Sequence, residues 1–413
     1  MHATIGNKLP STFMRLAWSN LAAQSAEQIG LAATPIVAVI ALGAGTAEIG
    51  VLQTAQTLPF VLFAIPAGLL ADRLSRRTVM ASAEALRAFS LVAVLALAAT
   101  GLLSWPLLAG LGFVGACGTV AFSVAAPALV PSLVPPGALS AANARIELAR
   151  TVAFAGGPAL AGALVGWLGG PPAFGVAAAL SAGAVILLAG VREPPRAAPA
   201  SRSPLAEIRE GARFLFRHPL LRPVFVTQFV FNTAFFVLQA VFVPYAVHQL
   251  GLSASGVGMT LASHGIGMVV GALIAARVMR RLPLGVVIAI GPVAGLVASV
   301  VMVATIWTPS ALLAGASFFL MGAGPIIWVI STTTLRQTVT PAHLLGRVSA
   351  LNIVAYGARP IGAAIGAAVG GLYGAEACLA VACAGFLIQA VTILVSPAVR
   401  LTRQPEIDEP TAA

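Results

Sequence analysis

The sequence predicts an all-α membrane protein with twelve transmembrane helices, arranged as two parallel six-helix repeats. Composition, the placement of arginine and an internal repeat support this fold class. Of the 413 residues, 59% are hydrophobic and only 8% are charged. A soluble domain has about 25% charged residues, so this chain cannot cover a water-exposed surface. The net charge of +11 comes mostly from arginines in short loops, which predicts membrane topology rather than nucleic-acid binding.

Twelve apolar runs are long enough to cross about 30 Å of hydrocarbon as helices that rise 1.5 Å per residue. We expect the helices at residues 13–41, 48–71, 78–100, 105–127, 143–168, 172–191, 222–249, 255–280, 284–306, 309–333, 346–370 and 374–397.

The loops between these runs alternate in charge. One set contains arginines, and the alternate set, residues 42–47, 101–104, 169–171, 250–254, 307–308 and 371–375, contains no Lys or Arg. Cytoplasmic loops carry the excess of Lys and Arg in membrane proteins. The sequence therefore predicts a multi-pass protein of the cell membrane with both termini in the cytoplasm.

A polar segment divides the chain into an N-terminal bundle (1–191), a cytoplasmic linker (192–221) and a C-terminal bundle (222–413). Within the linker, Ser203 offers an N-cap and Pro204 a first helical position. The residues that follow place Leu205, Ile208, Ala212 and Leu215 at helical spacing. We expect an amphipathic helix on the cytoplasmic membrane face, which acts as a tether between the bundles.

The two bundles repeat in sequence. A shift of 204 places Arg73, Arg76 and Arg77 on Arg277, Arg280 and Arg281, while Asp72 falls on Ala276. A shift of 205 places Pro136, Leu139, Gly157, Gly166 and Gly169 on Pro341, Leu344, Gly362, Gly371 and Gly374. Two such parallel repeats are typical of a class of secondary transporters.

The loop between the second and third helices carries a distinctive motif, Gly68-Leu-Leu-Ala-Asp-Arg-Leu-Ser-Arg-Arg-Thr-Val-Met80. It resembles the signature of the major facilitator superfamily at Gly68, Leu70, Asp72, Arg73, Arg76 and Arg77, with Ser75 where the family usually has Gly. The resemblance implies the major facilitator fold, with a pathway between the halves, and a gating role for this motif. Asp72 would help hold the cytoplasmic side closed, and Gly68 would allow a close approach of helices.

Two further resemblances concern the branch of this family. Residues 126–135, 141–143 and 335–348 resemble the secretion-effector branch that includes the enterobactin exporter. Gly157, Pro158 and Gly162 are similar to the G-P-x-x-G-G motif of proton-driven exporters, with Ala161 in place of one glycine. A smooth small-residue surface lets a neighbouring helix approach closely, and ordinary helix packing is the alternative explanation.

Charged residues inside membrane spans need a structural or functional reason. Glu27 shares one face of the first helix with Asn20, Gln24 and Gln28, which predicts a wet stripe that faces a proton or substrate cavity. The alternative is a structural carboxylate satisfied by a buried arginine.

The remaining intramembrane charges are predicted to form a buried network of Glu84, Arg87, Glu147 and Arg150. Glu84 and Arg87 are three residues apart and can pair on one helical face. Because an arginine neighbour would keep Glu84 ionised, Glu27, which has amides beside it in its own helix, is the predicted proton carrier. Arg359 needs a partner or an anionic substrate, and Asn232 is a weaker candidate for the cavity.

Enzyme functions find no support in the motifs. Lys8 is the only lysine, so no G-x-x-x-x-G-K-[ST] nucleotide loop exists, and neither H-E-x-x-H nor G-x-S-x-G occurs. We expect no cofactor and no metal site. The function predicted is proton-coupled export of a small lipophilic molecule, drug or siderophore-like, by a monomer. Uptake of a small metabolite and a non-transporting membrane sensor are the alternatives.

The orientation leads to a direct prediction. In a variant without native cysteines, a cysteine at Ser201 should react with an impermeant thiol reagent only from the cytoplasm. The reason is that Ser201 lies in the arginine-containing linker, which the positive-inside rule places in the cytoplasm. A cysteine at Ser253 should react only from outside. Labelling of both from one side, measured in intact cells and everted vesicles, would contradict the helix count.

Overall fold

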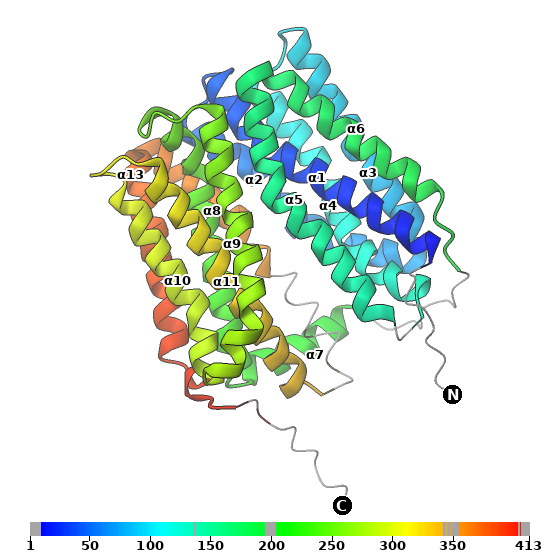
Figure 1. Cartoon of the computed structure of the whole chain (residues 1–413), viewed down its shortest axis with the longest axis vertical. Coiled ribbons are helices and arrows are strands. Elements are labelled where there is room, and N and C mark those ends of the chain that lie inside the picture. Colours follow the sequence, from blue (N-terminus) through cyan, green and yellow to red (C-terminus); the bar gives the residue numbers. More distant parts are fainter. Residues whose placement is uncertain are drawn as a thin grey trace, which may run out of the picture. The chain divides into compact units, whose positions relative to one another are not determined.

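The computed structural model describes residues 10–135, 138–194, 204–341, 344, 348, 355–403 and 405, and every regular element within them is helical. The helices are α1 (Ser11–Ile40), α2 (Thr46–Arg73), α3 (Arg76–Ala99), α4 (Trp105–Leu133), α5 (Leu139–Leu168), α6 (Gly170–Ala189), α7 (Pro204–Arg217), α8 (Leu221–His248), α9 (Ala254–Arg281), α10 (Leu284–Ala304), α11 (Ala311–Val339) and α13 (Ala358–Leu394). Figure 1 follows them along the chain.

Most of the described helices are apolar enough to cross a membrane, and α1, α2 and α7 are the ones that fall outside the criterion below. In the described part of the chain, nine helices meet a length and hydropathy criterion for crossing a membrane. The longest, α13, is two spans, because Gly374 breaks its helical backbone with φ +83°. The predicted all-α membrane fold is confirmed, and the observed helix ends lie close to the predicted ones. The first part of the predicted span 346–370 lies outside the described residues.

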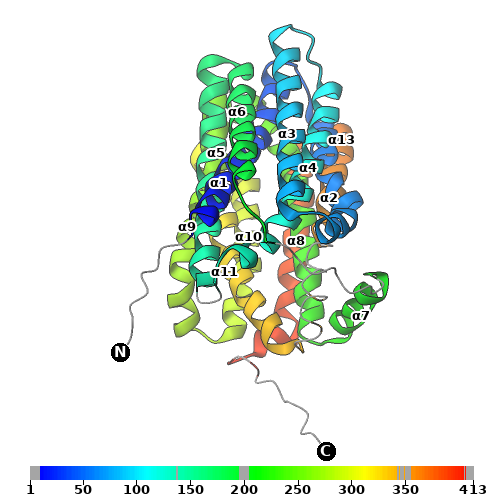
Figure 2. The same cartoon turned by 90° about the vertical axis from the view of Figure 1, so that its right-hand side faces the viewer.

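The chain forms two compact units. Unit 1 consists of Met1–Gly43, Ala55–Ala200 and Ser253–Gly258, and unit 2 of Ala44–Thr54, Ser201–Leu252 and Met259–Ala413. In unit 1, α1 packs between α5 and α6, as Figure 1 shows, and α3 lies beside α4 (Figure 2). In unit 2, α8 packs on α13 and α10 packs on α11.

The sequence repeat is also a repeat of backbone geometry. Gly169 and Gly374 are 205 residues apart, and both have φ +83°. Each lies at the junction between the fifth and the sixth span of its repeat. This left-handed backbone region favours glycine because it has no Cβ. Each unit therefore makes the same turn at the same place in its repeat.

Helix packing repeats in the same register. A Cβ on Gly157 of α5 would overlap Gln28 of α1, and a Cβ on Gly362 of α13 would overlap Thr233 of α8. Both pairs are related by the shift of 205. The first helix of each repeat is thus seated against a glycine of the fifth.

The linker helix α7 begins at Pro204, as the sequence predicts. Leu215 is buried and clusters with Leu221, Leu344 and Val348, and Ala212 packs against this cluster. The second half of the apolar face therefore packs on protein in unit 2, whereas the sequence analysis placed the whole face on the membrane. The side chains of Leu205 and Ile208 lie outside what the structure describes.

Glycine spacing on α4 brings α3 very close. A Cβ on Gly118 would overlap the carbonyl oxygen of Ala83, while a Cβ on Gly110 of the same helix would have nothing within 4 Å. Close backbone approach of this kind is how small residues promote helix association in membranes.

We predict opposite effects of alanine at these two glycines. Gly118→Ala should destabilise the protein by about 1–3 kcal/mol, because it overpacks the α3–α4 contact. The matched change Gly110→Ala should leave stability unchanged or slightly raised, since alanine is the better helix former. The measurement is thermal unfolding of each purified variant in detergent, and equal melting temperatures would refute the α3–α4 contact.

Candidate functional site: a shared arginine among buried carboxylates

The centre of unit 1 contains a cluster of three charged side chains. Arg87 of α3 donates from Nη1 to Glu84 Oε1 at 2.6 Å, and its Nη2 lies 3.6 Å from Glu27 Oε2 of α1. One arginine therefore serves two carboxylates. With all three ionised, the cluster has a net charge of −1.

Neutral groups from three helices complete the shell around Arg87. Its Nη1 also donates to the carbonyl oxygen of Ala23 at 3.2 Å, and its Nη2 donates to Thr119 Oγ1 at 2.7 Å. Ser181 of α6 donates to Glu84 Oε2 at 3.0 Å. The cluster thus joins α1, α3, α4 and α6, and both oxygens of Glu84 accept hydrogen bonds.

The two carboxylates differ in their surroundings. Glu84 is fully buried and has the short contact to Arg87, whereas the Glu27 side chain is 18% exposed and has the longer contact. The amides beside Glu27 lie in its own helix, whereas Arg87 reaches it from α3, which is the pairing with a buried arginine that the sequence left open as the alternative. The pairing of Glu84 with Arg87 agrees with their spacing.

The amides grouped with Glu27 do not act as one stripe. Asn20 Nδ2 donates to the carbonyl oxygen of Ile146 at 3.5 Å, and Gln28 packs against Gly157. Both amides are buried against α5. Gln24 is half-buried. Asn20 and Gln28 therefore serve helix packing, while Glu27 turns toward α3 and α4.

Glu147 and Arg150 do not belong to this buried cluster. They pair with each other on α5, with Arg150 Nη2 2.5 Å from Glu147 Oε1, and their side chains are 34% exposed for Arg150 and 55% for Glu147. The predicted single network of four charges is wrong in this respect. Spacing alone could not distinguish a pair at the surface from one in the core.

In the motif between α2 and α3, Ser75 is the N-cap of α3, and its Oγ accepts a hydrogen bond from the Thr78 amide. Its φ of −58° is open to any residue, so glycine is not required here. The Ser75 hydroxyl also donates to Glu193 Oε2 at 2.7 Å, and the Arg77 amide donates to the same oxygen at 3.0 Å. Glu193, just after α6, thereby anchors the N-terminus of α3.

The other motif residues have different surroundings. Arg76 donates to the carbonyl oxygen of Ala128 on α4, and Arg73 is exposed. A Cβ on Gly68 would have no atom within 4 Å, so the expected close approach at Gly68 is not observed. The side chain of Asp72 lies outside the described part of the structure, and its gating role stays a prediction.

The export-type motif on α5 has two close contacts within unit 1. Gly157 packs against Gln28, and Gly162 packs against Ala254 and Gly258 at the start of α9. Pro158 is buried inside α5. Both glycines thus allow a neighbouring helix to approach closely, and the role of this motif in export stays a prediction.

In unit 2, Arg359 is surrounded by aromatic and amide groups. Its guanidinium carbon lies 4.1 Å from the ring centre of Tyr356 and 5.5 Å from that of Phe236. Its Nε donates to Asn232 Oδ1 at 3.4 Å. Cation–π contact stabilises an arginine in an apolar setting. The structure therefore joins two residues that the sequence analysis treated separately.

Sequence reasoning missed Thr119, Ser181 and Glu193. Nothing in the local pattern distinguishes Thr119 or Ser181 from ordinary small polar residues of a membrane helix. Glu193 offered a signal, since an acid beside a proline just after a span can reach a neighbouring helix N-terminus, where anions are favoured.

The apolar helices of the described chain, the internal repeat and a charged cluster enclosed within one repeat are typical of a polytopic secondary transporter. The sequence matches the Major Facilitator Superfamily over residues 16–367. The chain belongs to this family of membrane transporters.

Two relatives are similar in sequence. The uncharacterized MFS-type transporter y4rN of Sinorhizobium fredii (strain NBRC 101917 / NGR234) is 33% identical over 262 residues. That match covers 60% of this chain, and the chain spans only 63% of that relative's length. The multidrug efflux pump Tap of Mycolicibacterium fortuitum is 28% identical over 340 residues, which cover 76% of this chain and 78% of Tap.

Solved structures agree in fold. The nucleoside transporter NupG has a TM-score of 0.72 at 14% identity, covering 93% of this chain and 98% of that one. A bacterial homolog of the human lysosomal transporter Spinster has a TM-score of 0.71 at 18% identity, covering 95% and 97%. These likenesses show the fold alone. The placement in the enterobactin-exporter branch stays a prediction.

The anchor at Glu193 leads to a pH-dependent prediction. Burial raises the pKa of Glu193, but the hydrogen bonds from Arg77 and Ser75 and the charge of Arg76 outweigh it, so the pKa lies below its ordinary value. A carboxyl whose pKa is lowered by folding stabilises the protein above its unfolded pKa, near ~4.3, and loses this effect as pH falls through the folded value.

We therefore predict that Glu193→Gln lowers the melting temperature by about 1–3 °C at pH 7, the scale of one charge at a helix terminus. The gap between the native protein and the variant should close as pH falls below 4.3 or so. Ser75→Ala should lower the melting temperature less in the Glu193→Gln variant than in the native protein, because the Ser75–Glu193 hydrogen bond is already altered there. A gap that stays constant down to the pH of acid unfolding would argue against this anchor.

Proposed function

We propose that the protein is a proton-coupled exporter of a small lipophilic molecule. The observation that carries this proposal is the sharing of Arg87 between Glu27 and Glu84. Two carboxylates and one guanidinium have a net charge of −1, and a single proton makes the cluster neutral. Intramembrane acids in such settings are typical of proton relays in transporters.

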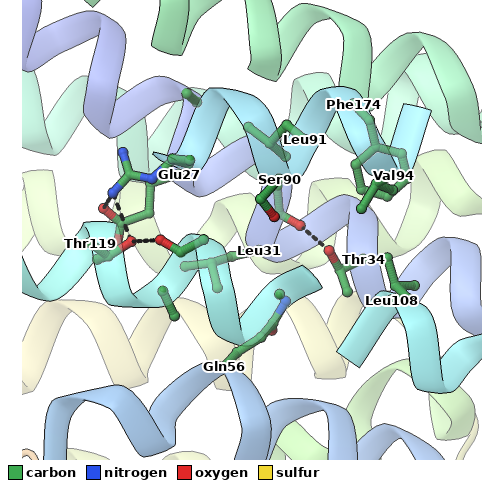
Figure 3. A pocket seen from close by; sticks show the side chains of 16 residues that line it. Glu27, Leu31, Thr34, Gln56, Ser90, Leu91, Val94, Leu108, Thr119 and Phe174 are labelled. Atoms are coloured by element: carbon green, nitrogen blue, oxygen red, sulfur yellow. Dashed lines mark hydrogen bonds and ion pairs between the residues drawn. The ribbon is translucent and has the colours of Figure 1, made fainter. Parts of the chain in front are cut away.

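Glu27 is the better candidate for the proton-binding group. Both Glu84 oxygens accept hydrogen bonds from neighbours, so its protonation would break a satisfied, fully buried arrangement. Glu27 has the longer contact to Arg87 and lines a cavity (Figure 3). Its carboxylate is thus the one of the pair that reaches the cavity.

The substrate class and the direction of transport are argued from a relative. Tap is a multidrug efflux pump, which favours efflux of drug-like molecules, and siderophore-like substrates belong to the same proposal. We assign Gln24, Arg359 and Asn232 to the substrate cavity. The exporter would act as a monomer in the cell membrane with both termini in the cytoplasm.

A transport assay with ethidium, a lipophilic cation, tests the coupling. In everted vesicles the native protein should accumulate ethidium when the lumen is acidified. Glu27→Gln should abolish this proton-driven accumulation, because the amide resembles the protonated acid and cannot release a proton. Ethidium binding to the purified variant should persist. Proton-driven accumulation by Glu27→Gln would contradict the assignment.

Two matched variants serve as controls. Glu84→Gln should mainly reduce the yield of folded protein, since breaking a buried ion pair costs about 3–5 kcal/mol. Glu147→Gln alters a half-exposed pair and should leave both yield and accumulation near native levels. Accumulation of ethidium on the opposite side would favour the uptake alternative, and the absence of flux for a broad panel of compounds would favour a sensor.

A further inference from the structure

A cavity lies next to Glu27 inside unit 1. It is lined by α1, α3 and α4, with Gln56 from α2 and Phe174 from α6. Figure 3 shows Glu27 and Thr119 at one end of it and Phe174, Val94 and Leu108 at the other. We refer to it as the α1–α3–α4 cavity.

The size of the cavity limits what it can hold. Its volume is about 60 Å³. A water molecule needs about 10–15 Å³ by this measure, so several waters fit. Sites for drug-sized ligands measure about 300–1,000 Å³, so a lipophilic substrate does not fit. The cavity suits water and protons.

The lining has polar groups along its length. Glu27, Thr119 and Arg87 lie at one end, Gln56 and Ser90 lie midway, and Thr34 lies farther on. Gln56 is only 7% exposed, and its Oε1 accepts no hydrogen bond from the described residues. A buried polar atom left without a partner costs about 1–3 kcal/mol. Water in the cavity would donate to this oxygen.

The cavity extends from Glu27 toward one end of the bundle. Thr34 lies about 9 Å from the end of α1 at Ile40, and Leu108 about 5 Å from the start of α4 at Trp105, at 1.5 Å per residue. Glu27 lies about 24 Å from the other end of α1, at Ser11. The near end carries the loops 42–45 and 101–104, which contain no Lys or Arg. By the positive-inside rule, this is the outer end.

Apolar side chains close this end. Phe174, Val94 and Leu108 line the cavity there and are at most 3% exposed. The layer between them and the outer loops is only a few residues thick.

We infer that protons reach Glu27 from the outer side through the α1–α3–α4 cavity, within the N-terminal bundle, along a chain of waters held by Thr34, Ser90 and Gln56. This rests on the proposed proton coupling. A hydronium ion at the outer end loses one O–H bond and becomes water, each water in the chain forms one O–H bond and breaks another, and the Glu27 carboxylate gains the last O–H bond. Among the described residues, Arg87 of α3 is paired with Glu27, and Glu84 is paired with the same arginine. Neutral Thr119 of α4 lies at this end of the cavity, and Phe174 of α6 lies at the opposite end.

The first test is independent of transport. In a variant with Cys117, Cys378 and Cys383 replaced by alanine, Ser90→Cys places a thiol in the cavity. Silver ion, which enters only through water, should block this thiol when applied from outside in right-side-out vesicles. The readout is protection from later maleimide labelling in denaturant. No protection, or protection only from the cytoplasmic side in everted vesicles, would overturn the route even where proton-coupled transport itself is confirmed.

The second test fills the cavity. A Cβ on Gly30 would lie 3.6 Å from Leu91, an ordinary contact, so Gly30→Leu can project into the cavity without displacing backbone. We expect it to slow silver protection of Ser90→Cys roughly tenfold, because the added side chain displaces the few waters that fit. The same variant should slow ethidium-evoked proton flux into proteoliposomes, reported by an internal pH dye.

Gly110→Leu is the matched control. It adds the same side chain to α4 at an exposed position with open space, so silver protection and proton flux should match the parent protein. Where Gly30→Leu fails to fold, Gly30→Ala should slow silver protection and proton flux in the same way but by less.

Native proton flux in a folded Gly30→Leu variant would show that protons reach Glu27 by another path. Ethidium transport that is lost when sodium in the buffer is replaced by choline would also overturn the inference.

Discussion

The N-terminal bundle depends on one buried guanidinium. Arg87 contacts α1 through the Ala23 carbonyl, α4 through Thr119 and its own helix through Glu84, which in turn holds α6 through Ser181. A charge enclosed in a membrane protein must be paired and hydrogen-bonded, because its desolvation is costly. These four helices therefore have to meet at this point. Glu27 sits at the edge of the arrangement, where its side chain is 18% exposed and lines the cavity.

The cavity beside this cluster results from glycines on α4. Gly112, Gly115 and Gly118 recur every three residues, and a Cβ on each would meet Gln56, Ser90 and Ala83 in turn. At Gly118 the missing side chain lets α3 approach closely. At Gly112 and Gly115 it leaves space that Gln56 and Ser90 only partly fill. The same stripe of small residues thus produces tight packing at one level of the bundle and a polar cavity at the next.

The fold was largely predictable, because its signals are local or periodic. Apolar runs, arginine placement and the 205-residue shift gave the spans and the repeat, which Gly169 and Gly374 confirm by sharing the same φ. The site was only partly predictable. Spacing paired Glu84 with Arg87, but it could not show that Arg87 also reaches Glu27, some 60 residues earlier in the chain. It also could not place Glu147 and Arg150 near the surface, because helical spacing fixes a shared face and not what that face meets.

The repeat places the carboxylate in one half of the molecule only. The register that relates Gln28 and Gly157 to Thr233 and Gly362 also relates Glu27 to Asn232. In unit 1 this position carries an acid that lies near Arg87, and in unit 2 it carries an amide that accepts from Arg359. A carboxyl group can be protonated or ionised, whereas a side-chain amide is neutral and has no such titration. The two halves, built on one plan, thus differ in chemistry at one equivalent position: the N-terminal half has a titratable group there and the C-terminal half a neutral amide.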